Sequence, residues 1–280
     1  MIFASRQIQE KYREQNQNLF LIFEDLTKAF DSVNREGVWR ILFRVGVPSK
    51  LINIIRSLHD GMRAIVLDRD GESEAFAVQN GTKQGCVLEQ ILFGIVIACM
   101  IYDWHIDTFK ELNTGIGVNY WSDGGVLNLR RLQAKTKLSC MLVRKLMFAD
   151  DCALAAHSEE DAQTLMDAFA RSAERYGLTI FLKKTEVLAQ PKPGVLSITP
   201  NILMSQTTLK TCENFPYLGS ILSNDCSINA EIRARTAKAA AVFGRLASRL
   251  WNTRYQSVYQ GCSLSCSETH SIVIRYGSET

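Results

Sequence analysis

The fold is decided by the stretch LFLIFED at residues 19–25. A short apolar run bounded by polar residues is typical of a strand buried on both faces, so we expect a buried strand over residues 19–24 that ends at Asp25. A second apolar run, LMFA at residues 146–149, is followed by Asp150 and Asp151. The two runs therefore predict two strand ends that present three carboxylates.

Carboxylates at strand ends suit metal-assisted phosphoryl transfer. Two divalent cations about 3.5 to 4 Å apart can activate an attacking hydroxyl and stabilise a departing oxygen when acidic ligands hold them. Mg²⁺ prefers oxygen ligands and keeps several waters, so two or three carboxylates with substrate phosphates are sufficient. Each half of the set also has a plainer interpretation, because Asp favours turns and a hairpin tip often carries an Asp-Asp pair.

Further motifs surround these acids in a fixed order. They are LTKAFDSVN at residues 26–34, NGTKQGCVL at 80–88, GLTI at 177–180, KKTEV at 183–187 and FPYLGS at 215–220. In order and spacing the chain resembles the reverse transcriptase domain of non-LTR (LINE-type) retrotransposons, from near Met1 to Trp251. The resemblance implies an RNA-directed DNA polymerase that binds an RNA template, a DNA primer and deoxynucleoside triphosphates, with two Mg²⁺ ions as cofactor and Mn²⁺ as the alternative.

The resemblance also implies the catalytic roles. Asp25 corresponds to the first metal ligand and Asp150 to its partner on an acidic hairpin, while Asp151 assists with the metal or the primer end. Lys184 corresponds to the lysine that protonates or neutralises the pyrophosphate leaving group. Beside Lys183, it could instead be one of two solvated charges on a strand edge.

Nucleotide and primer contacts are implied in the same way. Phe30 corresponds to the aromatic gate beneath the incoming sugar, and Gln84 and Gly85 correspond to second-motif residues that touch nucleotide and template. The turn Tyr217-Leu218-Gly219 corresponds to the primer grip. Plainer roles remain open, since Phe30 could be a core aromatic and the glycines could serve only a turn.

Two departures from the family bear on activity. Leu88 is followed by Glu89 and Gln90, where the family continues with small residues and a proline, and an acid near a phosphate-binding helix start opposes anionic ligands. Glu24 stands before Asp25, where the family tends to an apolar residue. If the Glu24 side chain points away from the site it is harmless; otherwise it perturbs the metal balance.

The resemblance divides the chain into three parts. These are a palm with partial fingers (1–210), the primer-grip turn with the start of the thumb (211–255) and a truncated tail (256–280). Only 24 residues precede Asp25, whereas the resembled enzymes carry a fingers region and often an endonuclease upstream. We therefore expect a fragment of a mobile-element polyprotein whose partners include the missing fingers and endonuclease regions, and whose activity alone is left open.

Composition sets the class of protein. With 280 residues, of which 46% are hydrophobic and 22% charged, the chain can bury a core of one large or two modest domains. The longest apolar stretch, residues 91–101, is shorter than the about 20 residues that span a bilayer, and no leader opens the chain. Eight cysteines without a paired framework suit reduced thiols. We expect an intracellular protein, cytoplasmic or nuclear, without membrane contact.

A zinc site is disfavoured near the end of the chain. The stretch CSLSC at residues 262–266 with His270 lacks a fourth ligand at usable spacing.

Basic residues gather in two acid-free regions, although the net charge is only +3. Residues 124–149 and 232–260 carry six Lys or Arg each and no Asp or Glu, which favours binding of a phosphate backbone. At helical spacing the second region has an apolar stripe beside a basic one. The apolar stripe is Ile232, Ala239, Phe243, Leu246 and Leu250, and the basic stripe is Arg235, Lys238, Arg245 and Arg249. A plain amphipathic surface helix is the alternative.

The remaining pattern completes an α+β polymerase palm, an antiparallel sheet with helices on one face. We expect helices at 40–45, 51–58 and 88–109, a hairpin from 63–68 to 74–79, an acidic hairpin from 141–149 to 152–157, and a helix from Ser158 to Gly177. Residues 110–136 are expected to form an insertion or loop.

Two other functions were weighed. A catalytically inactive, nucleic-acid-binding remnant would use the basic regions alone. Another palm-like fold, such as a nucleotide cyclase with paired acids, leaves residues 84–85 and 217–219 unexplained.

Overall fold

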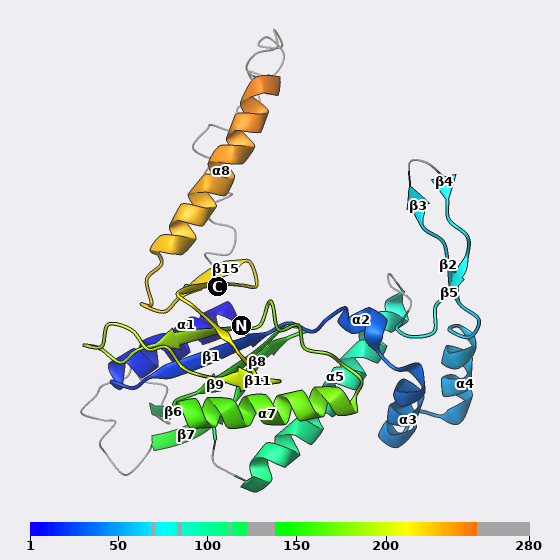
Figure 1. The fold of residues 1–280 in the computed structure, drawn as a ribbon, viewed down its shortest axis with the longest axis horizontal. Coiled ribbons are helices and arrows are strands. Elements are labelled where there is room, and N and C mark those ends of the chain that lie inside the picture. Colours follow the sequence, from blue (N-terminus) through cyan, green and yellow to red (C-terminus); the bar gives the residue numbers. More distant parts are fainter. Residues whose placement is uncertain (69–70, 83–85, 112–113, 122–137, 150, 251–280) are drawn as a thin grey trace. The chain divides into compact units, whose positions relative to one another are not determined.

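The computed structural model describes residues 1–250 except 69–70, 83–85, 112–113, 122–137 and 150 (Figure 1). The chain forms two compact units that alternate along the sequence. The larger comprises Phe20–Val187 and Pro200–Lys210, and the smaller comprises Met1–Leu19, Leu188–Thr199 and Thr211–Thr280. The three-part division expected from the sequence stays a prediction.

A five-stranded sheet has the order β13-β10-β1-β9-β8. Its strands are β1 (Leu19–Glu24), β8 (Lys145–Phe148), β9 (Asp151–Ala156), β10 (Glu186–Gln190) and β13 (Lys210–Cys212). All six residues of β1 are buried, which confirms the predicted strand with its bounds. Strand β9 is antiparallel to both β1 and β8, so the acidic hairpin lies beside the first apolar run.

Two helices of the larger unit, α5 (Val87–Glu111) and α7 (Glu159–Arg175), pack against each other, and α7 packs against β9 (Figure 1). The Trp104 Nε1 donates to the Leu165 carbonyl at 3.3 Å, and the Ser172 hydroxyl donates to the Met100 carbonyl at 2.8 Å. By length and composition α5 could cross a membrane over Val87–Thr108, which the shorter stretch considered above did not suggest. Its buried Met100 and Trp104 make the contacts of a core helix.

Helix α7 begins and ends where the sequence predicts. The Ser158 hydroxyl accepts the Asp161 N–H at 3.1 Å, as a capping box requires. At the other end Gly177 takes φ +71°, a left-handed conformation that favours glycine after a helix.

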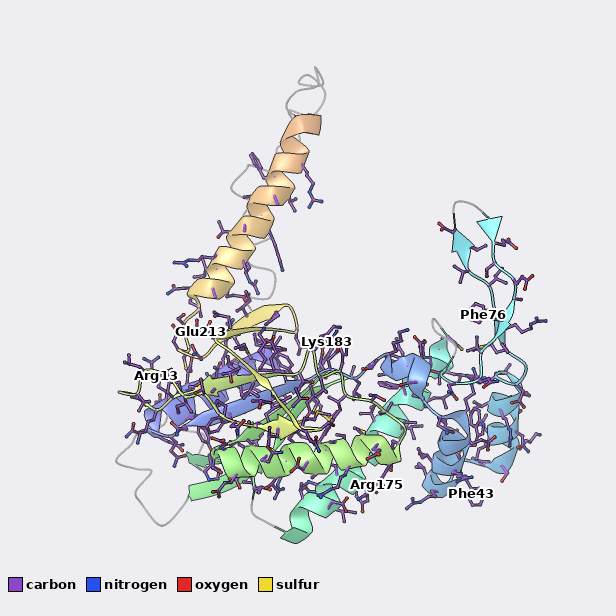
Figure 2. All side chains as sticks on the ribbon, in the orientation of Figure 1. Arg13, Phe43, Phe76, Arg175, Lys183 and Glu213 are labelled. Atoms are coloured by element: carbon purple, nitrogen blue, oxygen red, sulfur yellow. The ribbon has the colours of Figure 1, made fainter. Side chains whose placement is uncertain are left out.

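After β1 the larger unit continues with α2 (Ala29–Ser32), α3 (Arg35–Val45) and α4 (Ser49–Ser57). Helix α3 starts before the expected residue 40, because the Asn34 side chain caps it by accepting the Gly37 N–H at 3.1 Å. The expected hairpin then forms two short ladders, β2 (Arg63–Ala64) with β5 (Phe76–Ala77) and β3 (Leu67–Asp68) with β4 (Gly71–Glu72). Phe43 and Phe76 are exposed large apolar side chains of this part (Figure 2).

Two expectations are wrong in part. Of residues 110–136, expected as an insertion or loop, Ile116–Trp121 form strand β6, which pairs with β7 (Leu138–Val143) in an antiparallel ladder. The first strand of the acidic hairpin, expected over residues 141–149, is therefore divided, and of its two parts only β8 pairs with β9. A short ladder, β11 (Leu203–Met204) with β12 (Thr207–Thr208), completes the larger unit.

The smaller unit contains α1 (Ile2–Glu14), β14 (Asn214–Tyr217), β15 (Ser220–Ser223) and α8 (Asn229–Leu250). Helix α1 was not predicted. It is tied to β15 by Arg6, which donates to the Ser220 hydroxyl at 2.8 Å, and by Gln9, which donates to the Ser223 carbonyl at 2.9 Å.

Candidate active site at the end of the β1–β9 ladder

Asp25 and Asp151 leave the same end of one ladder. The last paired residues of β1 and β9 are Glu24 and Cys152; Asp25 directly follows the one and Asp151 directly precedes the other. Directly opposed residues of an antiparallel pair lie about 4.5 to 5.5 Å apart between Cα atoms. Asp150, the third expected carboxylate, lies outside the described residues. The structure thus brings together two of the three predicted acids.

The segment after Asp25 is held by the motif at residues 177–180. The Thr27 N–H donates to the Thr179 carbonyl at 2.8 Å, and the Phe181 N–H donates to the Asp25 carbonyl at 2.7 Å. Two motifs far apart in the sequence therefore meet at the first carboxylate.

Lys184 points at that carboxylate. Its Nζ lies 3.1 Å from Asp25 Oδ2 and 5.4 Å from the centre of the Phe181 ring. The side chains are 65% and 31% exposed, so the ion pair contributes at most about 1 kcal/mol and can open readily. Lys183, the preceding residue, is labelled in Figure 2. The Lys184 ammonium can therefore leave the Asp25 carboxylate and bind an anionic substrate instead.

Glu24 faces the other side of the sheet, because successive side chains of a strand alternate. Its carboxyl is 3% exposed, and neither oxygen has a hydrogen-bond partner within the part of the chain that the structure describes. Burial raises the pKa of Glu24 well above its usual range. Burial therefore disfavours a charge on Glu24, and its side chain points away from Asp25, which answers the question raised by the sequence.

Cys152, opposite Glu24, shares this environment. Burial raises the pKa of the Cys152 thiol, and the neighbouring Glu24 carboxyl raises it further. On the same strand face, Lys145 Nζ lies 4.9 Å from the centre of the Trp104 ring, and burial lowers the pKa of Lys145. This face therefore disfavours charge.

Phe30 lies on α2, which contacts the start of the second motif. Its ring centre is 4.0 Å from that of Phe93, and its carbonyl accepts the Thr82 N–H at 3.1 Å. Gly81 takes φ +79°, and a Cβ there would lie 2.7 Å from the Asp31 Cα. Gly81 is thus required by a close backbone approach. Gln84 and Gly85 lie outside the described residues.

Glu89 lies in the first turn of α5 and is 6% exposed. An acid therefore already occupies this helix start, where the positive end of the helix dipole would otherwise favour a negative ligand.

The expected primer grip forms a tight turn between β14 and β15. Leu218 and Gly219 take φ +49° and +81°, as a two-residue hairpin turn with two left-handed positions requires. Tyr217 is 3% exposed. The turn is held from β15, whose Ile221 N–H donates to the Glu231 carboxylate.

Helix α8 does not present all the expected basic residues. Arg235 forms an ion pair with Glu231 and is 14% exposed, so it lies on the packed side of the helix. Ile232, expected to pack, is 50% exposed. Lys238 and Arg245 are exposed as expected, and the side chain of Arg249 lies outside the described residues.

The oxygen donors of the site suit a hard divalent cation. Among the described residues, no group of three His, Cys, Asp or Glu side chains is arranged to hold a metal ion. The assignment of Asp25, Asp150 and Asp151 as metal ligands therefore stays a prediction. The cysteine-containing stretch at residues 262–266, where a zinc site was disfavoured, also lies outside the described residues. Among the described residues, Cys86, Cys99, Cys152 and Cys226 are free thiols.

Two curated relatives are similar to most of the chain. The retrovirus-related Pol polyprotein from type-1 retrotransposable element R2 of Popillia japonica is 24% identical over 216 residues, which is 74% of the chain and 27% of that protein. The retrovirus-related Pol polyprotein from type-2 retrotransposable element R2DM of Drosophila melanogaster is 26% identical over 203 residues, which is 70% of the chain and 17% of that protein. The chain thus spans only 27% and 17% of the length of these relatives.

A solved structure is similar in fold. Telomerase from Candida tropicalis, in complex with a fragment of telomeric RNA, matches with a TM-score of 0.50 and 13% identity over 99% of the chain and 40% of that protein. The likeness confirms the expected α+β polymerase palm.

Residues 2–222 match the family described as reverse transcriptase (RNA-dependent DNA polymerase). The match covers the first acidic motif, the acidic hairpin and the primer-grip turn. Members of this family depend on divalent metal ions. The chain belongs to the reverse transcriptase family.

Proposed function

We propose that the chain carries the nucleotidyl-transfer site of an RNA-directed DNA polymerase from a non-LTR retrotransposon. Two observations support this most directly. Asp25 and Asp151 stand at the same end of the β1–β9 ladder, and the Lys184 ammonium forms an ion pair with the Asp25 carboxylate. A metal-binding acid and a leaving-group cation are thereby close to each other.

Asp25, Asp151 and the adjacent Asp150 would hold two Mg²⁺ ions. When bound, such ions lower the pKa of a primer 3′-hydroxyl and neutralise charge on the departing oxygen. Mn²⁺ has the same preference for carboxylate oxygen and could replace Mg²⁺.

Lys184 acts on the leaving group. Its ammonium gives up the weak ion pair with Asp25 and donates to the pyrophosphate oxygen on which charge develops. The lysine is then positioned to deliver a proton as the bond to the α-phosphate breaks.

The partners follow from the same assignment. We infer an RNA template, a DNA primer and deoxynucleoside triphosphates, with Phe30 beneath the sugar, Gln84 and Gly85 on nucleotide and template, and residues 217–219 on the primer. Support for a nucleic-acid partner comes from the family and from exposed Lys238 and Arg245 on α8. We also propose that the protein acts inside the cell and that it works together with the fingers and endonuclease regions of a longer polyprotein.

Primer extension tests the function. Wild-type protein with an annealed RNA template, DNA primer, deoxynucleoside triphosphates and Mg²⁺ should extend the primer, and Asp25→Asn, Asp150→Ala and Asp151→Asn should each abolish or severely reduce extension. Asp167→Asn, at an exposed acid on α7, is the matched control and should extend like the wild type. Extension that survives Asp25→Asn would refute the site.

A second candidate, a catalytically inactive nucleic-acid-binding remnant, is favoured by the buried Glu89 at the start of α5. Filter binding separates the two. The remnant predicts salt-sensitive binding by the wild type with no nucleotide incorporation.

A further inference from the structure

Arg35 makes an unusual set of contacts at the start of α3. Its guanidinium donates from Nε to the Gly81 carbonyl at 2.8 Å and from Nη1 to the His59 and Val78 carbonyls at 2.9 Å. A longer contact joins Nη2 to the Asn80 carbonyl at 3.4 Å. One side chain therefore serves backbone carbonyls of two separate segments.

These carbonyls belong to two segments that are far apart in the sequence. His59 follows α4, whereas residues 78–81 leave the hairpin and enter the second motif. The Val78 N–H donates to the Met62 carbonyl at 2.9 Å, which brings the same segments together at the hairpin base. The guanidinium thus ties the end of α4 to the entrance of the motif.

Residues 81–82 are in turn hydrogen-bonded to the segment that carries Phe30, the proposed nucleotide gate. The Gly81 N–H donates to the Val33 carbonyl at 2.8 Å, and the Thr82 N–H donates to the Phe30 carbonyl at 3.1 Å. Since Gly81 also sits directly against the Asp31 backbone, a shift of this segment would displace the backbone of α2. Phe30 and the second motif are therefore placed together.

An open cavity lies beside the segment. It has a volume of about 700 Å³, and its lining includes Arg35, Asp60 and Asn80. Beside this open space, the hydrogen bonds from Arg35 help to set where residues 78–81 lie. A lysine could not replace the fork, because its three donors diverge from a single nitrogen.

We propose that Arg35 is a positioning residue for the incoming nucleotide, which acts by holding residues 78–82 against α2. The inference rests on the proposed polymerase function for its kinetic consequence. Its structural part, the placement of residues 78–82, stands independently of turnover.

The test compares Arg35→Met and Arg35→Lys with wild type, and with Arg40→Met as a control at an exposed arginine of the same helix. Four quantities are measured: hydrogen exchange of peptides that cover residues 78–82, the Kd of a fluorescent deoxynucleoside triphosphate, the kinetic constants of primer extension, and the Tm. A purely structural role would lower Tm, kcat and primer–template affinity together.

For Arg35→Met we expect exchange at residues 78–82 to quicken about tenfold, and nucleotide Kd and KM to rise about tenfold, because carbonyls lose donors and the gate loses its placement. The kcat at saturating nucleotide and the primer–template Kd should change by less than about threefold. Arg35→Lys should remain impaired, since it restores charge without the fork. Arg40→Met should match wild type.

The proposal would be overturned if Arg35→Met showed the same hydrogen exchange at residues 78–82 and the same nucleotide KM as the wild type. It would also be overturned if Arg35→Lys matched the wild type in both quantities, because the effect would then depend on charge alone. Parallel losses of Tm, kcat and primer affinity would also overturn it. If Arg35→Met does not fold, Arg35→Lys decides. If the wild type incorporates no nucleotide, the proposed function fails, while the exchange comparison still decides the placement.

Discussion

Replacing Glu24 with methionine tests how the buried side of the β1–β9 ladder is built. The Glu24 carboxyl is 3% exposed and has no hydrogen-bond partner for either oxygen within the described chain. Burying an unpaired polar group costs about 1 to 3 kcal/mol, so an apolar side chain of similar length should stabilise the fold by about that amount at pH 5. At higher pH the gain should be larger.

The pH dependence follows from the raised pKa of Glu24. Above the ordinary glutamate pKa of 4.5, the unfolded chain releases this proton and the folded chain retains it. The contribution of Glu24 to stability is therefore fullest below 4.5 and is lost as pH rises towards its folded pKa. Over this window the loss for one such group is about 1.4 kcal/mol per pH unit.

Urea unfolding between pH 5 and 7 is the assay. The wild type should lose stability as pH rises, relative to Glu24→Met, in which that component is absent. Glu174→Gln, at an exposed acid of α7, should keep the wild-type dependence. Primer extension by Glu24→Met should stay near the wild-type rate, because residue 24 faces away from Asp25. A variant less stable than wild type at pH 7, or one with the same pH dependence, would refute the reasoning.

Other substitutions probe the remaining assignments. Gly81→Ala should destabilise by about 2 kcal/mol or more in thermal unfolding, because its Cβ would lie 2.7 Å from backbone, whereas Gly219→Ala, with φ +81° but open space, should cost only about 1 kcal/mol. Lys184→Met should slow primer extension by about 100-fold at unchanged primer–template affinity; a loss below about threefold would remove its assigned role. Lys238→Met should reduce the salt dependence of nucleic-acid binding by about one phosphate contact, measured by filter binding at several salt concentrations, while Arg235→Met should mainly lower the Tm. The reverse pattern would contradict the observed ion pairing of Arg235.

Local signals in the sequence were enough for several elements. The strand at residues 19–24 and the cap at Ser158 were predicted because an apolar run and a capping residue act within a few positions. Helix α1 gave no such signal. Its buried positions include Ser5 and Gln9, whose polar side chains are satisfied by hydrogen bonds to other parts of the chain or its own backbone.

Register and helix rotation depended on contacts between distant residues. Periodicity could outline two stripes on α8, yet it could not show that Arg235 would pack beside Glu231 while Ile232 stays exposed. Likewise, the partner of β6 lies beyond a long intervening segment, so no short-range pattern indicates the pairing.

By itself the sequence determined the chemical inventory of this member of the reverse transcriptase family: strand ends with carboxylates, a lysine, a phenylalanine and a glycine-rich motif in a recognisable order. Only the tertiary structure decided which of two adjacent acids faces the site. Because side chains alternate along β1, the pairing of Glu24 with Cys152 buries Glu24 and leaves Asp25 beside Asp151 and Lys184.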